Sequence, residues 1–261
     1  MNYIKKAIRS FLLSPMVFAA FTVFFIGCAE SISIRTAPPQ LPVYEQPICP
    51  DEGYIWVPGY WAYGPNGYFW VPGIWEPAPE AGLLWTPGYW GWSNGYYIWH
   101  EGYWAGHVGF YGGINYGHGY GGVGYEGGYW NEGRLYYNSA VTNVNVAVIH
   151  TTYQAPANEN PVRTTVSYNG GAGGTSAKPL DKELVAARVP HISATPAQKR
   201  HFRAAASNRE LLVSFNQGRP RRDILAKRQG PALEKKVARQ KKPPQNKVNE
   251  KKQKEHREYE H

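Results

Sequence analysis

A repeated aromatic phrase limits what this chain can fold into. Each copy has two tryptophans five residues apart with a glycine between them: the sequence reads IWVPGYW at 55–61, FWVPGIW at 69–75, LWTPGYW at 84–90 and, more loosely, IWHEGYW at 98–104. A weaker fifth copy, YEGGYW at 125–130, has tyrosine in the first tryptophan place. A fixed period of this kind indicates one supersecondary unit used several times. The aromatic and β-branched content of the copies indicates strands.

Turn residues between the copies predict two antiparallel hairpins and their register. Asn94-Gly95 and Pro65-Asn66 suit the centres of two-residue turns. Counting outward from either turn places a tryptophan opposite a tryptophan at both ends of each hairpin. A cross-strand aromatic pair stabilises a sheet by ~0.2–1 kcal/mol relative to a pair of alanines. The expected pairs are Trp61–Trp70, Trp56–Trp75, Trp90–Trp99 and Trp85–Trp104.

The five-residue spacing within each copy bears on whether its two indoles lie on the same face of the sheet. Residues five apart on a regular strand point to opposite sides of the sheet. We therefore expect a one-residue bulge inside each copy, which returns both indoles to one face. Such a bulge often needs a positive φ, and it also tolerates proline. Alternatively, each Pro-Gly pair is itself a hairpin turn, although type II turns splay the strands. The residues concerned are Gly59, Gly73, Gly88 and Gly102, with Pro58, Pro72 and Pro87.

These features predict a mainly β fold: an aromatic-rich antiparallel meander of hairpins with Pro-Gly bulges, followed by short helices and a disordered basic tail. We expect the β domain to span 52–177 and the helical segment 178–218. Segment 105–128 is dominated by glycine and tyrosine. It is expected to be an irregular loop packed by its own aromatics or, alternatively, a flexible recognition loop. Further short strands are expected around 32–34, 133–138, 142–150 and 162–171.

Capping residues predict where the helices begin and end. A short helix is expected over 181–189. The next helix has Thr195 as N-cap, Pro196 at the first helical position and Gln198 as the reciprocal cap partner, and Gly218 is expected to end it. Its expected buried positions are Phe202, Leu211, Leu212 and Phe215.

The N-terminus has the pattern of an export signal. Basic residues precede an apolar run over 11–27, which ends in the phrase FIGC. The phrase is similar to a bacterial lipobox, so we expect a signal peptide over 1–27, lipid attachment at Cys28 and an extended lead over 28–51. A simply cleaved secretory signal and an uncleaved anchor are the alternatives. By resemblance to proteobacterial lipoproteins, Ala29 after the cysteine favours the outer membrane.

Charge is concentrated at the C-terminus. The chain carries 28 Lys and Arg against 19 Asp and Glu, a formal net charge of +9. Segment 219–261 holds 15 of these cations and 6 of the acids, so the whole excess lies there. Few apolar residues accompany them, which is typical of disorder. We expect the tail to attach to anionic lipids or envelope polymers. Nucleic acid is not an expected partner of an exported chain.

No motif for catalysis, metal or cofactor binding is found in the sequence. Four histidines, His100, His107, His118 and His150, follow no ligand spacing. Cys49 is expected to be a partly buried thiol, with an intermolecular disulfide as the alternative. We therefore expect no enzyme, no cofactor and no metal site.

Several phrases in order resemble one family. LPVYEQPICP, the W-x-x-G-x-W copies, HVGFYGGINYG, GYEGGYW and VSYNGG are similar to the bacterial YXWGXW repeat-containing proteins, over roughly residues 31–218. The resemblance implies an exported envelope protein or lipoprotein without an established activity, and it supplies no catalytic residues. The basic tail lies outside it.

The repeat tryptophans are the main candidates for a site. Each buries ~150–250 Å² when it joins a core, so most are expected to be core residues. The leading interpretation is a non-catalytic envelope lipoprotein with a structural or interaction role. The alternative is a glycan- or peptidoglycan-binding module that uses exposed tryptophans. Its candidate residues are Trp56, Trp61, Trp70, Trp75, Trp85, Trp90, Trp99 and Trp104.

Overall fold

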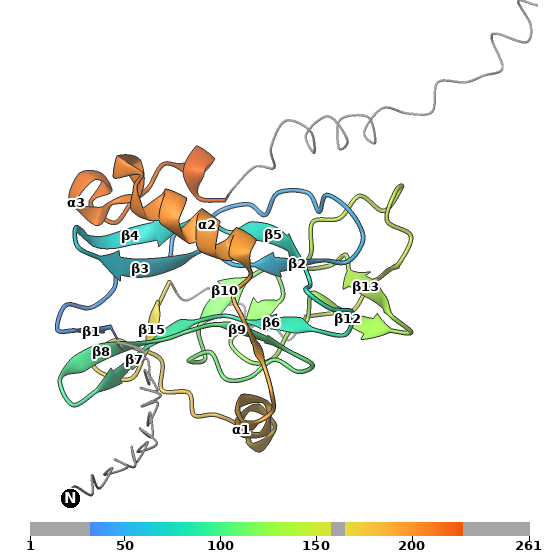
Figure 1. Cartoon of the computed structure of the whole chain (residues 1–261), viewed down its shortest axis with the longest axis horizontal. Helices are drawn as coiled ribbons and strands as arrows, with labels where there is room; N and C mark the ends of the chain where they lie inside the picture. Colours follow the sequence, from blue (N-terminus) through green and yellow to red (C-terminus); the bar gives the residue numbers. More distant parts are fainter. Residues whose placement is uncertain (1–31, 158–164, 227–261) are drawn as a thin grey trace, which may run out of the picture. The chain divides into compact units, whose positions relative to one another are not determined.

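The repeats form two antiparallel hairpins, each interrupted in the middle by its Pro-Gly region. The structure is a computed structural model that describes residues 32–157 and 165–226 (Figure 1). The first hairpin (residues 54–77) pairs β2 with β5 and β3 with β4, and the second hairpin (residues 84–105) pairs β6 with β9 and β7 with β8. The strands are β2 (Tyr54–Val57), β3 (Tyr60–Gly64), β4 (Gly67–Val71), β5 (Ile74–Pro77), β6 (Leu84–Thr86), β7 (Tyr89–Ser93), β8 (Tyr96–His100) and β9 (Tyr103–Ala105).

The predicted register is confirmed in both hairpins. All four expected tryptophan pairs lie opposite each other, and the ring centroids within each pair are 5.2–5.3 Å apart. The turns are those predicted. Asn94 and Gly95 have φ of 50° and 89°, and Gly67 closes the other turn with φ of 86°. The alternative in which Pro-Gly is the turn is therefore wrong.

The predicted one-residue bulge is not present. Val57 lies opposite Ile74, and Tyr60 lies opposite Val71. Two residues on each strand are therefore left out of the ladder, and the register is the same on both sides of this gap. The second hairpin keeps its register in the same way. None of the four repeat glycines has a positive φ. Each ladder is interrupted symmetrically. In the first hairpin, the proline of each strand lies opposite the glycine of the other. In the second hairpin, Pro87 lies opposite Gly102, and Gly88 lies opposite Glu101, which takes the place of the missing proline.

The repeat glycines are required for space rather than for backbone angle. A Cβ added to any of them would lie under 3.0 Å from the first indole of the partner copy. Interiors are close-packed, so such an overlap forces neighbours to move. Each copy therefore supplies a gap that its partner fills, and this answers why a glycine stands between the two tryptophans. The contacts are Gly59 with Trp70, Gly73 with Trp56, Gly88 with Trp99 and Gly102 with Trp85.

Short strands from distant parts of the chain widen the second hairpin. β1 (Ser33–Ile34) pairs with β8, and β15 (Tyr168–Asn169) pairs in parallel with β7. β16 (Ile192–Ser193) pairs with β9. The strand predicted around 32–34 is thus confirmed. The first hairpin keeps only its own strands in its two sheets.

The glycine- and tyrosine-rich segment packs by its own aromatics, the first of the two alternatives. It contains β10 (Asn115–Gly117) and β11 (Tyr120–Gly121). Tyr111, Tyr116 and Tyr120 are buried. Tyr116 donates its hydroxyl to the Gly88 carbonyl oxygen at 2.7 Å, and Tyr120 donates to the Trp85 carbonyl oxygen at 2.8 Å. The segment is therefore fastened to the second hairpin.

A small sheet follows, in which one predicted strand is confirmed and another is wrong. β13 (Arg134–Asn138) pairs with β12 (Gly128–Asn131) and β14 (Thr152–Tyr153). The strand predicted over 142–150 is instead a series of turns. Asn143 bonds Gln46 through both its backbone and its side chain, and Asn145 accepts a bond from the Ala147 N–H. The local bond of Asn145 competes with a ladder, and the bonds of Asn143 hold this segment to Gln46 of the lead.

The helical segment follows its predicted start but is broken. Thr195 accepts from the Gln198 N–H at 3.1 Å while the Gln198 side chain accepts from the Thr195 N–H at 2.8 Å. The predicted single helix to Gly218 is wrong, because Asn208 caps a new turn by accepting from the Glu210 N–H. Of the expected buried positions Leu211 is buried, two are half-buried, and Phe215 is 51% exposed. The elements are α1 (Asp181–Arg188), α2 (Pro196–Ala206), η1 (Arg209–Leu211), α3 (Val213–Asn216) and η2 (Arg222–Ile224).

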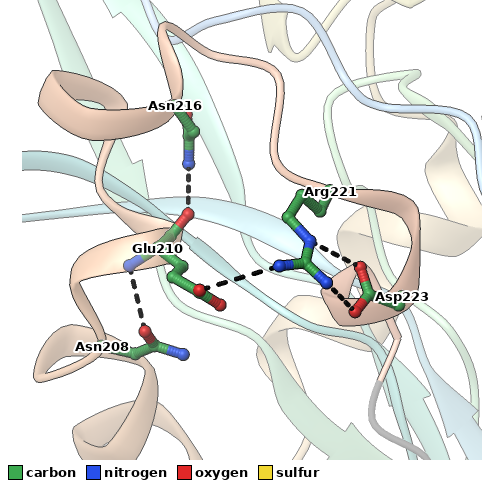
Figure 2. A network of polar contacts seen from close by, with 5 residues as sticks. All are labelled: Asn208, Glu210, Asn216, Arg221 and Asp223. Carbon is green, nitrogen blue, oxygen red and sulfur yellow. Dashed lines mark hydrogen bonds and ion pairs between the residues drawn. The ribbon is translucent and has the colours of Figure 1, made fainter.

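A polar network holds the last described residues against the preceding helical turns (Figure 2). The Arg221 guanidinium contacts both carboxylate oxygens of Asp223, at 3.1 and 2.6 Å, and the Glu210 carboxylate at 3.9 Å. Next to this network, Leu225 is buried. Its carbonyl oxygen accepts from the Trp70 indole at 2.9 Å. The predicted start of the tail at residue 219 is therefore too early, since folded structure continues to Ala226.

Several predictions lie outside the described residues. They are the signal peptide over 1–27, the lipidated Cys28, the first residues of the extended lead and the tail beyond Ala226. The described part of the lead is extended and packs against the hairpins: the Gln40 carbonyl oxygen accepts from the Trp61 indole, and the Pro47 carbonyl oxygen from the Trp75 indole.

Candidate binding pocket between the tryptophan hairpins

Seven of the eight candidate tryptophans are core residues. Their side chains are 0–6% exposed, and only Trp99 is half-buried. The row of exposed repeat tryptophans that a glycan-binding module would need is therefore not present. The physical reason is that each hairpin is covered by segments far away in sequence.

Five of the repeat indoles donate their N–H to other parts of the chain, whereas the buried Trp56 Nε1 has no hydrogen-bond partner among the described residues. Trp90 donates to the Trp61 carbonyl oxygen at 2.8 Å, which joins the second hairpin to the first. Trp104 donates to Gln198 Oε1 at 2.9 Å, which joins the second hairpin to α2. A buried indole N–H usually finds such a partner. The repeat thus supplies connections between segments, and its indoles are not a ligand surface.

A pocket of about 370 Å³ lies between the two hairpins and α2. Its walls come from the interrupted middle of each hairpin, with Pro58 and Pro72 from the first and Pro87 and Gly88 from the second. Tyr60 of the first hairpin stacks on Trp99 of the second, with centroids 5.1 Å apart. Where both ladders stop, the proline rings and the aromatic stack leave a mostly apolar hollow.

Charged groups stand on two sides of this pocket. Lys199 and Arg203 of α2 line it, as does Glu101 of the second hairpin, and all three are exposed. The pKa of the Tyr60 hydroxyl is raised, first by burial and then by the nearby Glu101 carboxylate. Tyr60 is therefore a neutral hydroxyl at physiological pH.

Two further polar residues on the wall are held by the fold. Gln198 accepts from both Trp104 and the Thr195 N–H. The His201 Nε2 lies 2.8 Å from the Pro72 carbonyl oxygen. Phe202 packs edge-on against Phe69 of β4 at 5.4 Å, which fixes α2 along the first hairpin (Figure 1). These contacts hold the α2 wall of the pocket against both hairpins.

Other candidate groups are placed elsewhere. Cys49 is 1% exposed, so the thiol is fully rather than partly buried, and the intermolecular disulfide is not available to it in this fold. Burial raises the pKa of Cys49 to about 12. His100 stacks on Tyr89 at 4.5 Å, and burial lowers its pKa. Within the described ranges, no three His, Cys, Asp or Glu side chains gather as a metal ion would require.

The chain is thus a mainly β protein in which paired indoles form the core and a mostly apolar pocket is lined by both hairpins. A family model described as the WXXGXW repeat matches residues 53–76 in two copies. The chain thus carries the WXXGXW repeat, and the resemblance drawn from its sequence is confirmed for the repeat itself. No curated protein and no solved structure matches the chain.

Sequence reasoning did not find the pocket. Lys199 and Arg203 were not among its candidate residues, and the repeat prolines were assigned to bulges. One signal was available: all the Pro-Gly pairs stand at the middle of their hairpins, where no ladder can form.

None of the helices in the described part of the chain is long and apolar enough to cross a bilayer.

Proposed function

We propose that this protein is a non-catalytic lipoprotein of the bacterial cell envelope with a structural or interaction role, anchored through Cys28. The apolar run over 11–27, the phrase FIGC and the WXXGXW repeat support this proposal. The folded part would belong to the outer membrane and face the periplasm or the cell surface. A periplasmic or secreted protein without a lipid anchor is the alternative location.

The observation that carries the interaction role is the pocket. Its body is apolar, and Gln198 and His201 on its wall are occupied by bonds to the fold. Small-molecule sites have this composition: an apolar cavity with a few placed polar groups. Such a wall supports holding a ligand rather than rearranging its bonds.

Metabolic labelling tests the anchor. Cells that express the full chain and are fed labelled palmitate should label the protein, and Cys28→Ala should abolish the label. Cys49→Ala is the matched control and should leave labelling unchanged, because Cys49 is buried. Undiminished labelling of the Cys28→Ala protein would contradict the proposed anchor.

A second experiment tests attachment by the basic tail. Residues 227–261 carry 12 Lys and Arg against 5 Asp and Glu. Each cation near an anionic membrane contributes ~1 kcal/mol, and salt screens this attraction. A Cys28→Ala chain that begins at residue 28, without the apolar run over 11–27, should bind phosphatidylglycerol vesicles in a salt-sensitive way, and deletion of 227–261 should remove this binding. Phosphatidylcholine vesicles are the control, and equal binding after the deletion would refute the role of the tail.

A further inference from the structure

The pocket between the hairpins has the size and lining of a site for a small amphiphile. Its volume of about 370 Å³ lies within the ~300–1,000 Å³ of typical ligand sites. An apolar ligand would be driven into it by the hydrophobic effect, whereas a strongly polar one would lose its hydration without replacement. The apolar wall includes Val57, Pro58, Val71, Pro72, Pro87 and Trp99.

The α2 side of the pocket favours an anionic group. Lys199 and Arg203 are four residues apart on α2, a spacing that places both on one face of a helix. Both line the pocket and both are exposed. Glu101 lines it from the second hairpin. Two cations therefore stand on the helix wall against one carboxylate on the other side.

We propose that the pocket binds a single-chain amphiphile with an anionic head group, of the fatty-acid type. The hydrocarbon chain lies between the two hairpins, and the carboxylate lies beside Lys199 and Arg203. This inference rests on the interaction role proposed above, which is carried by the same pocket, and names the ligand class. It does not depend on lipidation of Cys28, so failure of the anchor in the labelling experiment and failure of this site in the binding experiments are distinguishable.

Contact quenching by a brominated fatty acid tests the site. The full chain is used with Cys28→Ala, so that no acyl group of its own can enter the pocket. Trp99 is half-buried and lines the pocket, and bromine atoms in van der Waals contact quench indole fluorescence. Dibromostearate should quench saturably, and unbrominated stearate should reverse the quenching. Quenching that does not saturate, with the protein still folded, would overturn the proposal.

A steric pair of variants separates pocket binding from surface adsorption. Ala194 is half-buried and lines the pocket, whereas Ala172 is exposed and lies outside it. Ala194→Phe should occupy part of the pocket and weaken stearate binding at least tenfold. Ala172→Phe adds the same ring elsewhere and should leave the affinity unchanged. Equal affinities for both variants, with unchanged circular dichroism, would place the ligand outside the pocket.

Charge variants test the head group. Lys199→Gln and Arg203→Gln should each weaken stearate about two- to fivefold, as expected for an exposed ion pair. Lys182→Gln on α1 is the control variant and should leave the stearate affinity unchanged. Stearyl alcohol is the control ligand, and all these proteins should bind it with the same affinity. Glu101→Gln should tighten stearate about twofold. Tighter binding of an alkyltrimethylammonium than of stearate, weakened by Glu101→Gln, would show a cation site and overturn the proposal.

Discussion

The two tryptophan hairpins share one internal design but have different surroundings. In both, tryptophan faces tryptophan at each end, and the glycine of one copy receives the first indole of the other. In the first hairpin, the described lead and the C-terminal segment accept indole bonds: Trp61 donates to Gln40, and Trp70 to Leu225. In the second hairpin, neighbouring strands are added instead.

The difference is visible in burial. All four repeat tryptophans of the first hairpin are 0–6% exposed. In the second hairpin Trp99 is half-buried, and Trp92, which lies outside the repeat pattern, is 38% exposed. The copy that begins at Trp99 is also the one in which Glu101 replaces proline. The comparison teaches that the repeat dictates pairing, while coverage by other segments dictates which rings meet solvent or the pocket.

Truncating one indole in each hairpin is the most direct test of whether the two hairpins differ in coverage, and it has the largest expected effect. Trp70→Ala should lower the free energy of unfolding by about 4 kcal/mol, because a fully buried ring is lost and the Leu225 carbonyl oxygen loses its donor. Trp99→Ala should cost about 2 kcal/mol, since the ring is only half-buried. Urea unfolding monitored by circular dichroism measures both, and equal losses would contradict the difference in coverage.

The shared design is tested at the glycines. Gly102→Ala should destabilise by about 3 kcal/mol, because its Cβ would meet the Trp85 ring and also the Thr86 carbonyl oxygen at 2.6 Å. Gly73→Ala should cost about 2 kcal/mol, since its overlap is with the Trp56 ring and the Tyr44 hydroxyl. The control is Gly106→Ala, where an added Cβ has open space. A cost no larger than that of Gly106→Ala would mean that the glycines are not needed for space.

The smallest expected effect concerns the buried side of the first hairpin. There Tyr137 accepts from the Tyr54 N–H, and the buried Cys49 packs in the same core. Burial raises the Cys49 pKa from 9.0 to about 12, so only the unfolded chain releases this proton between those values. Stability from this thiol is thus full below pH 9 and falls as pH rises toward 12. At pH 10 the loss is about 1.4 kcal/mol.

Cys49→Ala provides the control for this pH effect. Between pH 8 and 10 its free energy of unfolding should fall less steeply than that of the unchanged chain. Parallel curves for the two proteins would show that Cys49 is not the group that titrates.

Much of the fold was predictable where the evidence is local. The Asn94-Gly95 turn and the tryptophan spacing predicted the register, and the Thr195 and Gln198 pair predicted the start of α2. The bulge was predicted wrongly because spacing alone cannot distinguish one extra residue on one strand from an interruption on both. The strand over 142–150 was predicted from alternation, but Asn143 instead donates its side chain to the distant Gln46 carbonyl oxygen, and the Asn145 side chain accepts from the nearby Ala147 N–H.

By itself, the sequence determined which residues pair, because turn chemistry and side-chain alternation act over a few neighbouring residues. Only the tertiary structure decided which indoles are closed to solvent, since their partners, such as Gln198 and Leu225, lie about a hundred or more positions along the chain. The pocket belongs to this second kind of information. It exists because two interrupted hairpins and α2 meet, and contacts over such distances leave no periodic trace in the residues that make them.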